Sequence, residues 1–172
     1  MTDKGFFNSL SGSTHDVVQE FLRMMSELRI DYCLIGGLAV NAYADPVVSL
    51  DFDTVIAIGS LDTLKKKASQ EFRLEVFPHS INLNSPHSNL RIQIQTDSRY
   101  QDFIKRAVTR SVMGYDFRVA SLEDVLQGKL WAWSDATRRP SKRQKDLADI
   151  LRLVETHPPL REKIPGTLRA ML

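Results

Sequence analysis

Two aspartates interrupt an otherwise apolar, β-branched segment between residues 50 and 58. Valine, isoleucine and threonine favour a strand there. Successive side chains of a strand point to opposite faces, so Asp51 and Asp53 share one face, about 7 Å apart along it. Two such carboxylates repel each other, and in an apolar strand they require a cation or hydrogen-bond donors. The alternative is a strand end at which both acids face water.

The composition indicates a globular protein of modest size. The length of 172 residues suits one domain, and 42% hydrophobic with 26% charged residues is typical of a soluble chain. The formal net charge of +2 is too small to indicate nucleic-acid binding by itself. We therefore expect a single domain over residues 1–172, and any electrostatic argument must rest on where charges cluster.

Cys33 is the only cysteine, so no intramolecular disulfide can form. It lies in the apolar run 32–35, which predicts a buried thiol, since a reactive thiol needs an exposed, electropositive setting. The N-terminal segment lacks an apolar signal core, and no apolar run is long enough to cross a bilayer. These features predict a cytoplasmic protein that does not use a membrane.

Hydrophobic periodicity predicts a mixed chain of the α/β or α+β class. Helices are expected at residues 13–28, 38–43, 61–68, 100–108, 121–133 and 147–154. Strands are expected at residues 30–35, 50–58, 72–77, 90–95 and 115–119, the last as a short edge strand. Residues 78–89, rich in Asn, Ser and Pro, are expected to form a loop. The core would then span about residues 30–119 and the C-terminal helices about 121–156.

Helix-capping patterns mark two of the expected helix starts. Ser13 with Asp16, and Ser121 with Asp124, have the spacing of a capping box. Gly36-Gly37 follows the first expected strand and precedes a short helix, where backbone N–H groups can approach an anion. A tight turn explains this glycine pair equally well.

Residues 34–42 (Leu-Ile-Gly-Gly-Leu-Ala-Val-Asn-Ala) and 49–53 (Ser-Leu-Asp-Phe-Asp) together resemble the core signature of the minimal nucleotidyltransferase superfamily. The resemblance is strongest to its bacterial branch, which includes toxin-type members. It implies a nucleotidyltransferase fold with a mixed central sheet, helices packed mainly on one side and the Asp51–Asp53 strand near the centre. It also implies that Asp51 and Asp53 are catalytic ligands of Mg²⁺ (or Mn²⁺), and that Gly36 and Gly37 lie beside the triphosphate.

Two downstream elements extend the resemblance. Lys129, and the run 143–150 with Arg143, Lys145 and Asp146, resemble the Lys and Lys-Asp-x-x-Asp elements of the same branch. The implied function is transfer of a nucleotide from a metal-bound nucleoside triphosphate to a hydroxyl of RNA, protein or a small molecule. In that function Lys129 would offset charge on the leaving pyrophosphate. The alternative is a catalytically degenerate nucleotide- or partner-binding module, which includes a component of a toxin–antitoxin pair.

One carboxylate expected from the resemblance is missing. Active members usually carry a third acid on a neighbouring strand, and Gln93 occupies the matching position. A neutral amide adds no charge to a metal site and is no general base. Asp97, further along the same strand face, and Glu75, on the preceding strand, are the candidates to replace it.

The C-terminal helices carry charges at positions expected to be buried. Lys129 falls on the apolar stripe of its helix, and Asp146 on the inner side of the last one. Such residues are rarely buried unless paired, so we expect these helices to pack together, with Lys129 facing either Asp146 or a phosphate. Five of the eight residues from 138 to 145 are basic, which fits either phosphate steering or a solvated loop leading into a helix. The lysine run 65–67 is typical of a solvated helix face.

Overall fold

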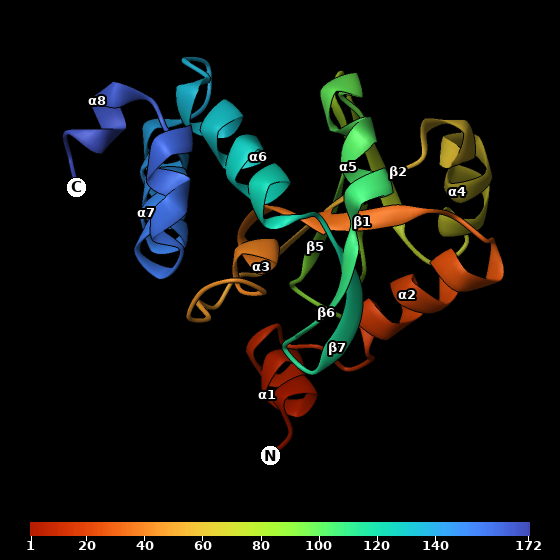
Figure 1. Ribbon diagram of the computed structural model, residues 1–172. Coiled ribbons are helices and arrows are strands. Elements are labelled where there is room, and N and C mark those ends of the chain that lie inside the picture. The colour runs from red at the N-terminus through yellow and green to blue at the C-terminus, as the bar shows by residue number, and fades with distance from the viewer.

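A seven-stranded mixed sheet forms the centre of the computed structural model, which describes residues 1–172 (Figure 1). The strand order is β3-β4-β5-β2-β1-β7-β6. The strands are β1 (Tyr32–Ile35), β2 (Asp51–Ile56), β3 (Arg73–Phe77), β4 (Ser80–Asn84), β5 (Arg91–Gln95), β6 (Val108–Val112) and β7 (Tyr115–Val119). β2 is the middle strand, as predicted, and it pairs antiparallel with β1 and parallel with β5.

Eight α-helices and three short 3-10 helices complete the chain. The α-helices are α1 (Asp3–Leu10), α2 (Val17–Glu27), α3 (Gly36–Val40), α4 (Leu61–Ala68), α5 (Gln101–Arg106), α6 (Leu122–Ser134), α7 (Pro140–Thr156) and α8 (Gly166–Arg169). None of them combines the length and the apolar character needed to cross a lipid bilayer.

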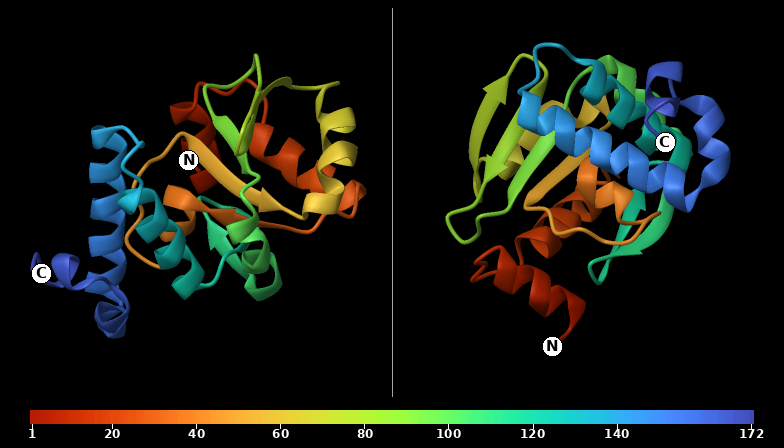
Figure 2. Two further views of the ribbon diagram at one scale, coloured as in Figure 1. Left: turned by 90° about the horizontal axis from the view of Figure 1, so that it is seen from above. Right: turned by 90° about the vertical axis from the view of Figure 1, so that its left-hand side faces the viewer.

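The two faces of β2 point into different surroundings. Phe52 packs edge-on against Phe21 of α2, with ring centroids 5.3 Å apart. Because neighbouring side chains on a strand alternate, α2 covers the face opposite to Asp51 and Asp53. α6 and α7 pack against each other on the side of the two aspartates, where α7 runs in front of the sheet in the right-hand view of Figure 2.

One hydrophobic cluster runs through the sheet and the helices on both of its faces. Cys33 lies within it and is fully buried, as predicted. Burial disfavours the thiolate and raises the pKa of Cys33 to about 12.

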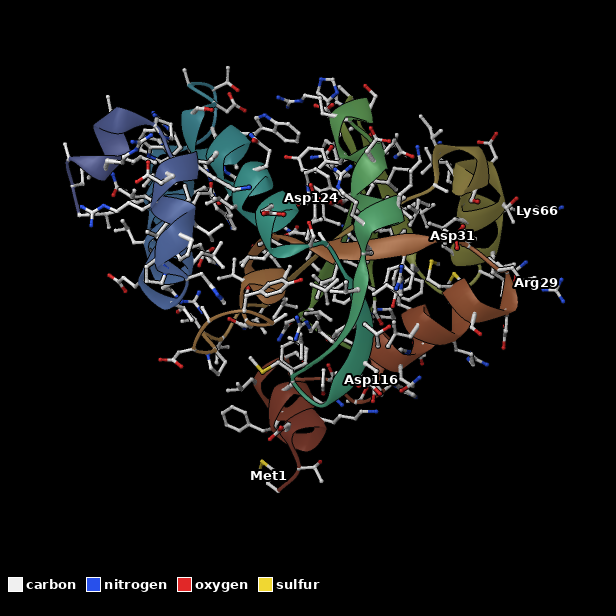
Figure 3. All side chains as sticks on the ribbon, viewed as in Figure 1. Met1, Arg29, Asp31, Lys66, Asp116 and Asp124 are labelled. Carbon is white, nitrogen blue, oxygen red and sulfur yellow. The ribbon has the colours of Figure 1, made fainter.

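Lys66 lies on the outer side of α4 and faces solvent, as predicted for the lysine run (Figure 3).

The structure corrects the predicted start of α2. The helix expected from Ser13 begins at Val17, because Asp16 is the N-cap and its Oδ1 accepts a hydrogen bond from the Gln19 N–H at 3.0 Å. Ser121 is confirmed as the N-cap of α6, since its Oγ accepts from the Asp124 N–H at 3.2 Å; the Asp124 carboxylate binds Arg106 and does not complete a capping box.

Three strand predictions also need correction. The expected loop 78–89 contains β4, which forms an antiparallel hairpin with β3; Ile81 and Leu83 are buried between polar neighbours. Val108 opens β6 and does not extend the preceding helix. β6, not β7, is the edge strand, because β7 pairs with β1 as well.

The basic segment expected as a loop is helical from Pro140 onward, since proline is well suited to the first turn of a helix.

Candidate functional site

The sheet register brings the two aspartates to the end of β1. Asp53 lies opposite Ile35 on β1 and opposite Gln93 on β5, while Asp51 lies opposite Arg91. Since Ile35 is the last residue of β1, the chain turns into α3 directly beside Asp53. Two strands and one turn therefore define the position of this carboxylate.

Gly36 is required by this close approach. Its φ of +71° lies in the left-handed region, and a Cβ there would come within 2.3 Å of Asp53 Oδ2. Gly37 is different, because an added Cβ would have only ordinary contacts, the nearest being Ser49 Oγ at 3.7 Å. Of the two glycines in the motif, Gly36 is thus the one that forms the wall around Asp53.

A cavity of about 110 Å³ lies between the ends of these strands and α6 and α7. Its polar lining includes Asp53, Gln93, Gln95, Lys129, Arg138 and Asp146. Asp124, in the first turn of α6 (Figure 3), also lines the cavity. Its carboxylate pairs with Arg106 at 2.8 Å. Sites for complete small-molecule ligands usually measure about 300 Å³ or more, so a nucleotide bound here would extend beyond the cavity.

Asp51 is neutralised within the protein. Arg91 Nη2 donates to its Oδ1 at 2.7 Å, and Lys142 Nζ donates to its Oδ2 at 3.0 Å. Burial opposes ionisation of this carboxyl, but the two cations outweigh it and lower its pKa. Neither basic residue was predicted as part of the site.

Asp53 has no comparable partner. Its carboxylate makes no ion pair or side-chain hydrogen bond, and burial raises its pKa although the Lys129 charge acts in the opposite direction. A carboxylate in this situation gains from any cation that reaches it. Asp53 is therefore the group in the cavity most in need of an external positive charge.

The donor set suits a divalent cation that shares its ligands with a substrate. Mg²⁺ prefers oxygen ligands and is commonly held by one or two carboxylates together with phosphates and water. Asp51 and Asp53 supply two carboxylates on one strand face, and Asp53 is unpartnered. No group of three or more His, Cys, Asp or Glu side chains is arranged to hold a metal. The residues therefore fit Mg²⁺ or Mn²⁺ that is completed by substrate oxygens.

The position of a third carboxylate is occupied by amides. Gln93 lies directly beside Asp53, and Asn82 of β4 lies beside Gln93 in the same row. The two candidate replacements lie elsewhere. Asp97 pairs with Arg99 at 2.8 Å and does not line the cavity. Glu75 is in the same row but three strands from β2, about 14 Å at ordinary strand spacing.

Lys129 forms a buried ion cluster between α6 and α7. Its Nζ lies 3.0 Å from Asp146 Oδ1 and 2.8 Å from Asp149 Oδ2. Burial works against the ammonium, but Asp149 and Asp146 outweigh it and raise the pKa of Lys129. Arg138 also binds Asp146, at 2.7 Å, and Arg152 binds Asp149, at 2.8 Å. The predicted packing of the two helices is confirmed, and of the two alternatives for Lys129, Asp146 or a phosphate, the structure shows the contact with Asp146.

The two remaining predicted residues, Arg143 and Lys145, lie at the rim of the candidate site. Arg143 Nε donates to the Trp133 carbonyl at 2.7 Å and so joins α7 to the end of α6. Lys145 is exposed, and its Nζ is 3.4 Å from Ser49 Oγ, just before β2. Neither side chain lines the cavity.

Sequence reasoning missed Arg91, and it included Lys142 only as one member of the basic run 138–145, without a contact to Asp51. Arg91 lies two residues before Gln93 and therefore on the same strand face, a signal that the alternation already contained. Lys142 lies one turn before Asp146 on α7, but nothing in the sequence shows that this turn meets β2.

A family comparison agrees with this geometry. The model of the family described as "Nucleotidyl transferase AbiEii toxin, Type IV TA system" matches residues 39–172, which include Asp51, Asp53 and the Lys129 cluster. The chain belongs to the AbiEii family. The match begins just after Gly36-Gly37, so the turn beside Asp53 lies outside the matched region of this AbiEii-family protein. No curated protein sequence matches the chain.

Solved structures with the same fold cover most of this AbiEii-family chain. ANT(2")-Ia in complex with adenylyl-2"-tobramycin gives a TM-score of 0.62 at 14% identity over 90% of this chain and 94% of that chain. The lincosamide antibiotic adenylyltransferase LnuA, lincomycin-bound, gives 0.56 at 12% identity over 83% and 99%. An antigenic nucleotidyltransferase-like protein from Paracoccidioides brasiliensis gives 0.54 at 21% identity over 81% and 74%. The similarity establishes the nucleotidyltransferase fold.

Proposed function

We propose that this protein transfers a nucleotide from a nucleoside triphosphate bound with Mg²⁺ or Mn²⁺ to a hydroxyl of RNA, protein or a small molecule. The observation that carries the proposal is the unpartnered Asp53, which faces the cavity beside Gly36 and shares a strand face with Asp51. Family membership supports the same reaction class. We further propose that the chain acts as one domain and in the cytoplasm.

The reaction joins the acceptor hydroxyl oxygen to the α-phosphorus and breaks the bond to the bridging oxygen of the β-phosphate, so pyrophosphate leaves. The metal would supply positive charge to the phosphates when bound by Asp51 and Asp53. The hydroxyl proton would pass to solvent water, since Asp51 and Asp53 are committed to the metal and the amide of Gln93 beside them is no general base. Gly36 and Gly37 would receive phosphate oxygens on their backbone N–H groups.

In this proposal the Lys129 cluster has an indirect role. Lys129 lines the cavity, but its ammonium is already bound by two carboxylates. Its charge is therefore offset by these two acids, and its role would be to hold α6 to α7 on that side of the cavity and not to bind phosphate directly. Arg138, which also lines the cavity, adds a partly exposed guanidinium on that side.

A second candidate is a nucleotide-binding module without transfer activity, and the amide at Gln93 favours it. Replacement of Gln93 by Glu would place a third carboxylate beside Asp53. If the protein is such a module without transfer activity, Gln93→Glu should raise its affinity for Mn²⁺, measured in the presence of a triphosphate, by about tenfold or more. The matched control is Gln95→Glu, two residues along the same strand face and in the same cavity, for which we expect a smaller gain.

The family description also supports a role as the toxin of a toxin–antitoxin pair. In that role, induced expression arrests growth, and the Asp51→Asn/Asp53→Asn variant at equal protein level does not. Growth arrest that persists in the variant would separate toxicity from the nucleotide site.

The direct test is incubation of the purified protein with each triphosphate, labelled at the α-phosphate, together with total RNA or protein. We expect label in the acceptor with wild type and none with Asp51→Asn/Asp53→Asn. The matched control is Asp31→Asn/Asp116→Asn, which removes two exposed acids remote from the cavity (Figure 3). Labelling that the first variant retains would refute the assigned site.

A further inference from the structure

Both oxygens of Asp51 are held by basic side chains from other parts of the chain. Arg91 on β5 holds Oδ1, and Lys142 in the first turn of α7 holds Oδ2. The side chain of Asp51 is 25% exposed, that of Arg91 41% and that of Lys142 30%. The three groups thus form a partly solvated ion cluster at the edge of the proposed nucleotide site.

This cluster conflicts with the role proposed for Asp51. A divalent cation at Asp51 must share the carboxylate with two positive charges within about 3 Å of its oxygens. Like charges at such short range repel strongly even in partly solvated surroundings. Asp51 can hold a metal well only when at least one of the basic groups finds another anion.

Arg91 and Lys142 are able to change partners. Both are long and partly exposed, and their charged ends lie outside the hydrophobic core. The guanidinium of Arg91 also has a buried Nε that makes no hydrogen bond, so the present contact does not satisfy all of its donors. A polyphosphate offers several charged oxygens, arranged tetrahedrally around each phosphorus, that guanidinium and ammonium donors bind well.

We propose that Arg91 and Lys142 hold Asp51 in the free protein and transfer to the phosphate oxygens of the incoming triphosphate. The inference rests on the proposed function and adds two triphosphate-binding residues to it. It makes metal and nucleotide binding mutually dependent, because the anion that removes the cations from Asp51 also frees that carboxylate for the metal. In the free protein, the basic pair disfavours metal binding.

Two single substitutions test the exchange, Arg91→Met and Lys142→Met, each checked for an unchanged circular dichroism spectrum and melting curve. Mn²⁺ binding to the protein alone is measured by electron paramagnetic resonance. Binding of inorganic tripolyphosphate and of Mg²⁺·ATP is measured by calorimetry. The matched control is Arg139→Met, which removes an exposed charge from the start of the same helix, where no ion pair holds it.

The proposed exchange predicts that the affinity for Mn²⁺ and the affinity for the phosphate ligands change in opposite directions. Each variant binds Mn²⁺ alone more tightly than wild type by roughly threefold to tenfold, since a competing charge is gone. Each binds tripolyphosphate and Mg²⁺·ATP more weakly, by about tenfold. Arg139→Met changes both affinities by less than about twofold.

A purely structural ion cluster predicts a different result. If Mn²⁺ affinity is unchanged or falls in both variants, or if tripolyphosphate and Mg²⁺·ATP bind as in wild type, the exchange is wrong. If wild type and both variants bind Mg²⁺·ATP equally well, only the proposed exchange is overturned. Wild type that binds no Mg²⁺·ATP overturns the proposed function together with it.

Discussion

The buried cluster around Lys129 predicts a large stability effect. Lys129, Asp146 and Asp149 are 7%, 1% and 4% exposed, and Lys129→Met leaves the two carboxylates without their shared ammonium. Breaking a buried pair by removing one partner typically costs about 3–5 kcal/mol. Arg138 and Arg152 each still hold one of the acids, so we expect the lower end, about 3 kcal/mol.

Urea denaturation at pH 7, followed by far-ultraviolet circular dichroism, measures this loss as a shift of the midpoint at unchanged slope. Adding Asp149→Asn to Lys129→Met should recover part of the loss, because one uncompensated buried charge is removed. The control is Lys105→Met, since Lys105 pairs with Asp102 on the surface, where both side chains are well exposed. That change should stay within about 0.5 kcal/mol.

A loss below about 1 kcal/mol for Lys129→Met would refute this reasoning, because the ammonium would then not be needed to hold the acids. A loss near 3 kcal/mol that the second substitution does not reduce would indicate that packing of the lysine stem, not its charge, is responsible.

Three further predictions follow from the same geometry. Gly36→Ala should cost about 2 kcal/mol in thermal or urea unfolding, from its positive φ and the contact with Asp53, whereas Gly37→Ala should leave stability unchanged or slightly higher. Asp53→Asn should raise the free energy of unfolding at pH 7, because burial raises the pKa of Asp53 and its ionised form opposes folding increasingly as the pH rises above the ordinary aspartate pKa. Asp51→Asn should lower the free energy of unfolding at pH 7, because the lowered pKa of Asp51 stabilises the fold above about pH 4, a contribution that is lost as the pH falls further. Titration with a thiol reagent at pH 8 should leave native Cys33 unreacted and modify it only in denaturant; fast native reaction would show that the thiol is not buried.

Alternation and capping explain why much of the fold could be predicted. The apolar positions of β5 repeat every second residue, β2 is apolar or β-branched apart from its two acids, and both segments are strands in the structure. The Ser121 cap was readable because its hydrogen bond closes within three residues. Lys129 was expected to face either Asp146 or a phosphate because charged residues on an apolar helix stripe need a partner, and the structure shows Asp146 in that place.

Other features depend on contacts that sequence spacing does not contain. β4 was missed because Asn82 and its polar neighbours resemble a loop, although β3 and β5 pair with both edges of the strand and Ile81 and Leu83 on its other face are buried in the core. Asp149 is the second acid of the Lys-Asp-x-x-Asp element, but its place beside Lys129 follows from the packing of α6 on α7. Lys142 reaches Asp51 across 91 residues of chain, so only the folded arrangement shows the contact.

The central claim is that Asp51 and Asp53 form a metal-dependent triphosphate site. Calorimetry with ATP and each of the other triphosphates, with and without Mg²⁺, tests it most directly on wild type and on Asp51→Asn/Asp53→Asn. We predict that wild type binds at least one triphosphate only when Mg²⁺ is present, and that the variant, although folded, does not. Failure of wild type to bind any triphosphate, or equal binding by the variant, would contradict the claim.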